Sequence, residues 1–96
     1  MERYSSRTID DARKITIPSE LRRILSLQPG DEVTLQHIDT LLVLQKSGNS
    51  ADYNGCKISD LGTIELPDEA MQKLGWKVTD RISMYHIDNI IIFRAA

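Results

Sequence analysis

The sequence contains an internal repeat in which the second half follows the first at a fixed offset of 49 residues. Aligning residues 9–46 with residues 58–95 needs no gap and gives ten identities over thirty-eight positions. The longest identical run is His-Ile-Asp, which stands at residues 37–39 and again at residues 86–88. Many of the mismatches exchange one apolar residue for another. A repeat of this kind predicts two copies of one supersecondary unit.

Each copy follows the same order of expected elements. In the first copy we expect an extended piece at residues 7–9, strands at 14–17, 32–38 and 41–46, and a two-turn helix starting at Pro18. An apolar stripe of Leu21, Ile24 and Leu25 gives that helix its buried face, with Arg22 and Arg23 turned to water. In the second copy we expect the corresponding elements at residues 57–58, 63–66, 68–74, 81–87 and 90–94. Residues 1–6 are polar, and we expect them to be frayed.

This plan predicts a mainly β fold with short helices, built from two β-β-α-β-β repeats. One unit of about forty residues is too small to close a core, whereas two units can do so by interleaving their hairpins. We assign the first repeat to residues 1–46, a polar linker to residues 47–55 and the second repeat to residues 56–96. Whether the repeats pair within one chain or between two chains is left open by the sequence. The strand at 41–46 is apolar on both faces, which predicts burial on both sides or an interface.

The overall charge of −2 conceals a local excess of basic residues. Six arginines and lysines fall within the first 23 residues, which predicts one basic face on a net-acidic protein. The apolar runs are strand-sized, the N-terminus has no signal-peptide pattern, and the single cysteine, Cys56, can form no internal disulfide. We therefore expect a cytoplasmic protein in which Cys56 is an inert residue at a strand edge.

The stretch IDDARKITIPSELRRIL at residues 9–25 resembles the signature of AbrB/SpoVT-type swapped-hairpin DNA-binding domains. The match extends over residues 7–46 and continues through Gly30-Asp31 into two apolar strands. The tandem copies resemble the MraZ arrangement. The resemblance implies a swapped-hairpin β-barrel and a DNA-binding transcriptional regulator, with double-stranded DNA and a second copy of the chain as partners.

The resemblance also implies which residues face DNA: Arg7, Lys14, Arg22 and Arg23 stand at the basic positions of the family. Arg13 stands where the family usually has glycine, so it adds a fifth positive charge and alters the expected turn. Ser26 likewise replaces a glycine that usually ends the helix. Exposed arginines on a short helix can reach phosphates and guanine edges, although they can equally serve solubility and pair with Glu20. The predicted DNA-binding set is Arg7, Arg13, Lys14, Arg22 and Arg23.

The second repeat departs from the pattern in the opposite way. It keeps the glycines Gly62 and Gly75 and loses the charge, with Thr63, Met71 and Gln72 at the positions of the basic residues. Acidic Glu65 and Asp68 replace Thr16 and Ser19. We interpret this copy as structural, completing the barrel or forming an oligomer.

Three function classes stay open. The first is a DNA-binding regulator, and the second is an antitoxin-like module that binds a protein partner. A tail-type antitoxin is disfavoured because the sequence ends in the strand at 90–94. The third class is a scaffold without either activity. His37 and His86 recur in the two repeats, but two imidazoles alone make a poor metal site. No nucleophile set or glycine-rich phosphate loop is present, so we expect no enzyme activity, metal or cofactor.

Overall fold

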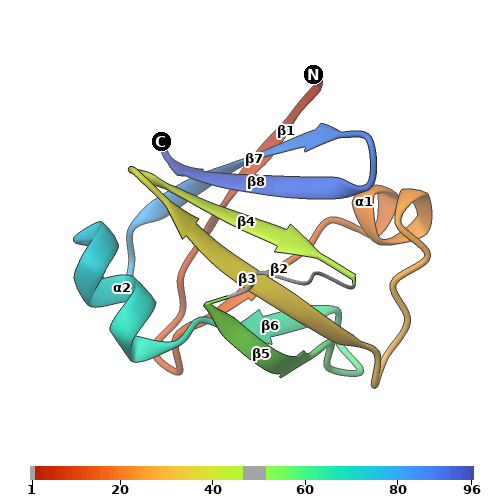
Figure 1. Ribbon diagram of the computed structural model, residues 1–96, viewed down its shortest axis with the longest axis horizontal. Helices are drawn as coiled ribbons and strands as arrows, with labels where there is room; N and C mark the ends of the chain where they lie inside the picture. Colours follow the sequence, from red (N-terminus) through yellow and green to blue (C-terminus); the bar gives the residue numbers. More distant parts are fainter. Residues whose placement is uncertain (1, 47–51) are drawn as a thin grey trace.

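The computed structural model describes residues 2–46 and 52–96. The first half forms β1 (Glu2–Thr8), β2 (Lys14–Thr16), α1 (Ser19–Ile24), β3 (Glu32–Ile38) and β4 (Leu41–Gln45). The second half forms β5 (Tyr53–Lys57), β6 (Thr63–Glu65), α2 (Asp68–Leu74), β7 (Arg81–Ile87) and β8 (Ile90–Ala95). The mainly β fold with a β-β-α-β-β order in each half is therefore confirmed (Figure 1).

The strands of the two halves are interleaved within one chain. The six-stranded antiparallel sheet has the order β1-β7-β8-β4-β3-β5, and β2 and β6 form a separate two-stranded ribbon. Each half thus gives its first strand to the third strand of the other half, and the central pair β4–β8 joins the two hairpins. This is a swapped-hairpin barrel in which covalent linkage replaces a second subunit.

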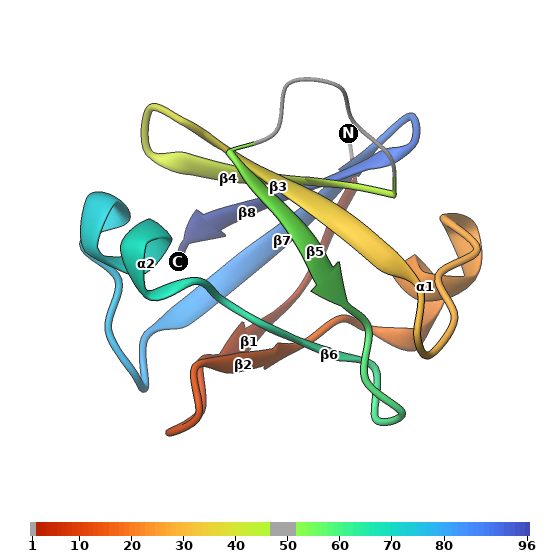
Figure 2. The same cartoon turned by 60° about the horizontal axis from the view of Figure 1, so that its bottom comes forward.

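The strand registers define an internal two-fold axis. Val43 pairs with Ile92 across β4–β8, and Ile15 pairs with Ile64 across β2–β6. In both pairs the partners lie 49 residues apart, so each residue faces its own equivalent. A residue opposite its own equivalent lies on the symmetry axis, which therefore crosses the molecule from the β4–β8 pair to the β2–β6 ribbon. Figure 2 shows α1 and α2 on opposite sides of this line.

The core lies between the six-stranded sheet and the ribbon, and both halves contribute to it. Ile15 and Ile64 of the ribbon are each 1% exposed, and Phe93 of β8 is fully buried. Trp76 and Met84 of the second half are also buried. The predicted apolar stripe of α1 was partly wrong, because Ile24 is 44% exposed while Leu21 and Leu25 are buried. The helix has only six residues, so it presents too short a surface to bury all three.

Positive backbone φ angles recur at equivalent positions of the two halves. Three of these pairs combine a glycine with another residue, namely Arg13 with Gly62, Ser26 with Gly75, and Gly30 with Thr79, while the fourth pairs Asp39 with Asp88. The left-handed conformation costs a residue other than glycine about 1–2 kcal/mol. The turn therefore keeps its shape where Arg13 replaces glycine, and the helix end keeps its shape where Ser26 does.

The start of the chain and the linker differ from the sequence-based expectation. Residues 2–6 were predicted to be frayed, but they belong to β1, which pairs with β7 from Glu2↔His86 to Thr8↔Arg81. The polar character of this segment misled the prediction, since β1 is an edge strand whose backbone hydrogen bonds carry the pairing. Most of the predicted linker lies outside the described residues, and its last three residues, 53–55, begin strand β5.

Candidate nucleic-acid interface

The β2–β6 ribbon forms the surface at one end of the internal two-fold axis (Figure 2). Its two isoleucines point into the core, so the alternate residues of both strands point outward. Lys14 lies directly opposite Glu65, and Thr16 lies directly opposite Thr63. Lys14, Thr16 and Glu65 are exposed, while Thr63 is half-buried. The outward face is therefore polar and carries one cation facing one carboxylate.

Two equivalent turns hold the start of each ribbon strand. In the first half, Asp10 Oδ1 accepts hydrogen bonds from the backbone N–H groups of Ala12 (2.9 Å) and Lys14 (2.8 Å). In the second half, Ser59 Oγ takes the same place and accepts from Thr63 N–H at 3.0 Å. Side chains of this kind stabilise a turn by bonding the backbone a few residues ahead. Asp10 therefore has a specific structural role in holding this turn.

Arg13 reaches from its turn onto the second half of the chain. Its Nε donates to the carbonyl oxygen of Leu66 at 3.3 Å, and its Nη2 lies 3.1 Å from Glu65 Oε2. The Arg13 and Glu65 side chains are 39% and 57% exposed, so water screens this ion pair. Part of the positive charge at this end of the ribbon is therefore balanced within the molecule.

Arg22 lies at the other end of the ribbon. Its Nε donates to the carbonyl oxygen of Ile17 at 2.9 Å, and the Ile17 N–H in turn donates to the carbonyl oxygen of Gly62. A Cβ at Gly62 would lie 2.5 Å from Arg22 Cζ, so the guanidinium lies against this glycine. Arg22 is half-buried rather than turned freely to water, which corrects that part of the helix prediction.

The remaining predicted residues are less closely grouped. Arg23 is exposed on α1, beside Arg22 in the chain. Arg7 is half-buried on β1, where it lies opposite Ile82 and its Nη1 donates to the Ser6 carbonyl oxygen at 3.4 Å. The structure therefore brings Arg13 and Lys14 to one end of the ribbon and Arg22 to the other, and it places Arg7 on the edge of the large sheet.

Two residues of the second half belong to this surface although sequence reasoning gave that half a structural role only. Glu65 faces Lys14 and pairs with Arg13, and Gly62 contacts the Arg22 guanidinium. The repeat held a signal for both, because an offset of 49 places Gly62 at the position of Arg13 and Glu65 at the position of Thr16. The missing information was that the second strands of the two halves pair with each other.

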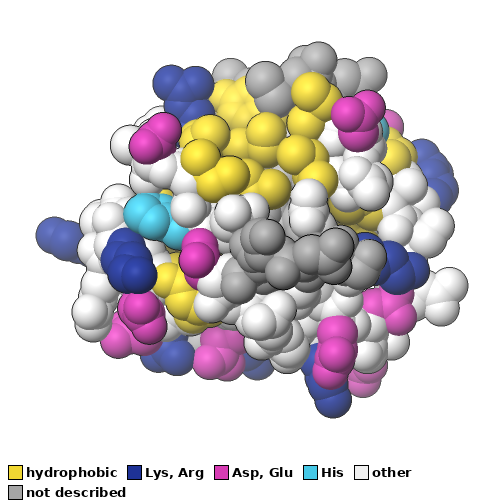
Figure 3. All heavy atoms as spheres, in the orientation of Figure 1, with side chains coloured by type: hydrophobic (Ala, Val, Ile, Leu, Met, Phe, Trp, Pro, Cys, Tyr) yellow, Lys and Arg dark blue, Asp and Glu magenta, His cyan; other side chains and the backbone are white. Residues whose placement is uncertain are grey.

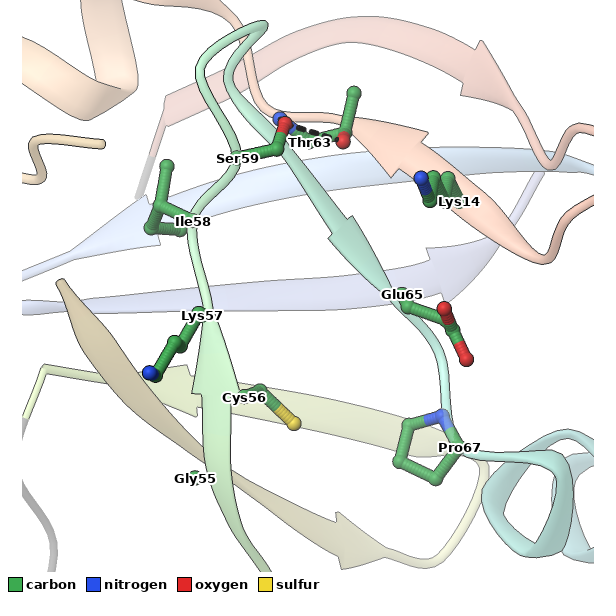
Figure 4. Close-up of a pocket in the computed structure, with 9 residues that line it drawn as sticks. All are labelled: Lys14, Gly55, Cys56, Lys57, Ile58, Ser59, Thr63, Glu65 and Pro67. Atoms are coloured by element: carbon green, nitrogen blue, oxygen red, sulfur yellow. Dashed lines mark hydrogen bonds between the residues drawn. The ribbon is translucent and has the colours of Figure 1, made fainter. Parts of the chain in front are cut away.

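A groove of about 530 Å³ opens beside the ribbon, between β5 and β6 (Figure 4). Lys14, Lys57 and Glu65 line it, together with Cys56 and the hydrogen-bonded hydroxyls of Ser59 and Thr63. Burial raises the pKa of the Cys56 thiol, and the nearby Glu65 carboxylate adds to this shift. A raised pKa keeps the thiol protonated at neutral pH, where the thiolate is the reactive form.

The opposite end of the axis has a different chemistry. The outward face of β4, β8 and β7 carries Leu41, Val43, Ile92 and Tyr85, and Figure 3 shows hydrophobic side chains gathered over β4 and β8. A small hollow there is lined by Leu41, Tyr85, Ile92 and Arg94. The two-fold axis thus connects a polar ribbon, bordered by Arg13 and Arg22, with an apolar sheet face.

Over residues 2–46 and 52–96, no group of three or more histidine, cysteine, aspartate or glutamate residues is placed to hold a metal ion. Neither helix in this part of the chain has the length and apolar character needed to cross a membrane.

Two comparisons with known proteins gave matches, one to a solved structure with a similar fold and one to a protein family over the first half of the chain. The solution structure of PHS018 from Pyrococcus horikoshii is similar over 98% of this chain and 92% of that chain, with a TM-score of 0.56 and 12% sequence identity. At that identity the likeness concerns the fold alone. Residues 7–52 match the family described as antidote-toxin recognition MazE, bacterial antitoxin. No curated protein matches the chain.

The matched segment includes the motif at residues 9–25, so the family similarity and the sequence motif fall on the same part of the chain. The matched segment contains all five predicted DNA-binding residues and ends before strand β5. The second half lies outside this match, but it repeats the sequence pattern of the first half and shares one sheet with it.

Proposed function

We propose that this protein is a DNA-binding transcriptional regulator that contacts the duplex through the β2–β6 ribbon and the exposed face of α1. The observation that carries the proposal is the placement of Arg22, whose Nε is fixed on the Ile17 carbonyl oxygen. A guanidinium held in this way loses little rotational freedom on binding, and its remaining N–H groups fit the oxygens of a phosphate. In the described part of the chain, no carboxylate lies within ion-pair distance of it.

The other cations support the same surface. Arg23, next to Arg22 in the chain, and Lys14, next to Arg13, are both exposed, so a duplex lying along the ribbon would meet several positive charges. Arg7 belongs to the proposed set as a flanking contact from β1. Each phosphate that is neutralised releases counterions, and binding then weakens with salt in proportion to the number of such contacts. Nucleoid localisation follows from DNA binding and is part of the proposal.

The test removes two adjacent arginines. Arg22→Ala/Arg23→Ala should weaken duplex binding by about tenfold or more and reduce the slope of log K against log salt by about 1.8, for two lost phosphate contacts. Fluorescence anisotropy across a salt series measures both quantities. Lys73→Ala/Lys77→Ala removes the same charge from exposed positions of the second half and is the matched control. Unchanged affinity and slope in the arginine variant would contradict the proposal.

A second candidate function is binding of a protein partner, and the family match favours it, since that family is described by toxin recognition. The apolar face over β4 and β8 offers a surface for such a partner or for a second copy of the chain. Capture of one stoichiometric protein, with no retention on DNA at low salt, would favour this function over the first. Analytical ultracentrifugation tests the proposed homodimer directly.

A further inference from the structure

Two arginines from non-equivalent positions make the same contact on opposite sides of the internal axis. Arg22 Nε donates to the carbonyl oxygen of Ile17 at 2.9 Å, and Arg13 Nε donates to the carbonyl oxygen of Leu66 at 3.3 Å. Ile17 and Leu66 lie 49 residues apart, and each directly precedes the proline that begins its helix. The two acceptors are therefore equivalent, whereas the two donors are not.

The repeat shows how this exchange is possible. The equivalent of Arg22 in α2 is Met71, and the equivalent of Arg13 in the opposing turn is Gly62. At one end of the ribbon the helix supplies the arginine and the turn supplies a glycine. At the other end the helix supplies a methionine and the turn supplies the arginine.

Steric contact explains why each end holds only one arginine. A Cβ at Gly62 would lie 2.5–2.8 Å from three atoms of the Arg22 guanidinium, so a larger residue in this turn would displace the guanidinium from the Ile17 carbonyl, and glycine lets it stay there. Met71 is 5% exposed and belongs to the core, which leaves the turn at that end free to carry a side chain. Arg13 takes this place and keeps the left-handed backbone of the turn, with φ of 60° against 78° at Gly62.

We propose that Arg13 replaces the arginine that α2 lacks, so that a single chain presents two guanidinium sites related by its internal two-fold axis, each binding one backbone phosphate of the same duplex. The phosphate part rests on the proposed function. The pairing also means that the placement of the two guanidinium groups is two-fold although the sequence of the repeats is not. One chain can then meet both strands of a duplex, whose backbones are themselves related by two-fold axes, without a second subunit.

The two sites differ in what surrounds them. The Arg13 guanidinium is shared with Glu65, whereas the Arg22 guanidinium has its Nε on a backbone carbonyl and lies on a glycine. A phosphate at the Arg13 site has to compete with a carboxylate, and a phosphate at the Arg22 site does not. The Arg22 site is therefore the stronger of the two.

The first experiment moves the guanidinium from the turn to the helix. Arg13→Gly should weaken duplex binding about 3–10-fold and reduce the salt slope by about 0.9, for one lost phosphate. Arg13→Gly/Met71→Arg recreates in the second half the helix arginine facing a glycine, and it should recover most of the lost affinity and slope. Arg13→Gly/Asn89→Arg restores the same charge at the exposed β7–β8 turn and should not. Equal recovery by both double variants, or by neither, would overturn the proposal.

The second experiment needs no DNA and tests the contact itself. Gly62→Ala and Gly75→Ala impose similar backbone strain, with φ of 78° and 72°, but only Gly62 has Arg22 against it. Gly62→Ala should therefore displace Arg22 from the Ile17 carbonyl and raise the unfolding equilibrium constant about threefold more than Gly75→Ala, and Arg22→Ala should abolish that excess. Additive effects would overturn the steric basis of the exchange.

The two experiments separate the inference from the function on which it rests. A wild-type protein that binds no duplex at low salt overturns the proposed function and the phosphate sites together. In that case urea unfolding would still measure the coupling between Gly62 and Arg22. That coupling decides whether steric contact between the turn and the guanidinium limits each end of the ribbon to one arginine.

Discussion

The two halves of the molecule share one backbone and differ in what that backbone carries. Their strand registers correspond, and their left-handed residues occupy equivalent positions. The irregularity in the β1–β7 pairing, before Arg7, also has its equivalent in the β3–β5 pairing. Their surfaces have diverged, because Lys14, Arg22 and Arg23 of the first half correspond to Thr63, Met71 and Gln72 in the second. The comparison teaches that the fold requires a positive φ angle at certain positions, and that glycine is only one of the residues that can adopt it there.

The largest expected effect tests whether the halves contribute equally to the core. Ile15 and Ile64 face each other on the axis, and each is 1% exposed. Ile15→Ala and Ile64→Ala should each lower the free energy of unfolding by about 2–4 kcal/mol, because each leaves a cavity at an equivalent site. Urea denaturation measures both values, with exposed Thr16→Ala as the control. A difference of more than about 1 kcal/mol between the two would show that one half dominates the core.

A smaller effect is expected where the halves exchange glycine for another residue. Thr79 has a φ of 80°, and the equivalent residue in the first half is Gly30. Thr79→Gly should raise the free energy of unfolding by roughly 0.5–1 kcal/mol, since relief of the left-handed strain outweighs the added freedom of the unfolded chain. The reverse exchange, Gly30→Ala, should lower it by a similar amount, because a new Cβ there meets no atom within 4 Å and adds only strain. Thermal unfolding that moved both variants in one direction would refute this account.

The smallest expected effect concerns the charge on the ribbon. Glu65→Thr gives the second half the residue that the first half has at Thr16. Releasing Arg13 and removing the carboxylate opposite Lys14 should strengthen duplex binding about fivefold and steepen the salt slope by up to about 0.9. Stability should change by less than about 1 kcal/mol, because the ion pair is more than a third exposed. Anisotropy titration is the measurement, and weaker binding would mean that Glu65 supports the interface instead of opposing it.

Much of the fold followed from local rules. Pro18 and Pro67 each precede a helix, alternation of apolar residues marked the longer strands, and the offset of 49 identified two equal units. These features depend on neighbouring residues, so a single sequence contains them. The N-terminal strand β1 escaped prediction because its pairing partner, β7, lies some eighty residues away.

The candidate site was predicted by residue type but not by environment. Arg13, Lys14 and Arg22 do border one ribbon, yet their partners Glu65, Leu66 and Gly62 all come from the other half. Whether a charge is free or balanced depends on contacts between residues about fifty positions apart. No local pattern reports such contacts, and only the observation that β2 pairs with β6 brings them into view.

The interleaving of the halves has a consequence for how the chain reaches this state. Glu2 of β1 pairs with His86 of β7, so the barrel cannot close until nearly the whole sequence is present. Contacts of such long sequence separation slow folding, because the loops must close before the contacts compensate for the lost entropy. Joining the halves in one chain offsets this cost, since the second half is held at a high effective concentration beside the first. The barrel therefore forms by a unimolecular reaction, whose yield is independent of how much of the protein the cell makes.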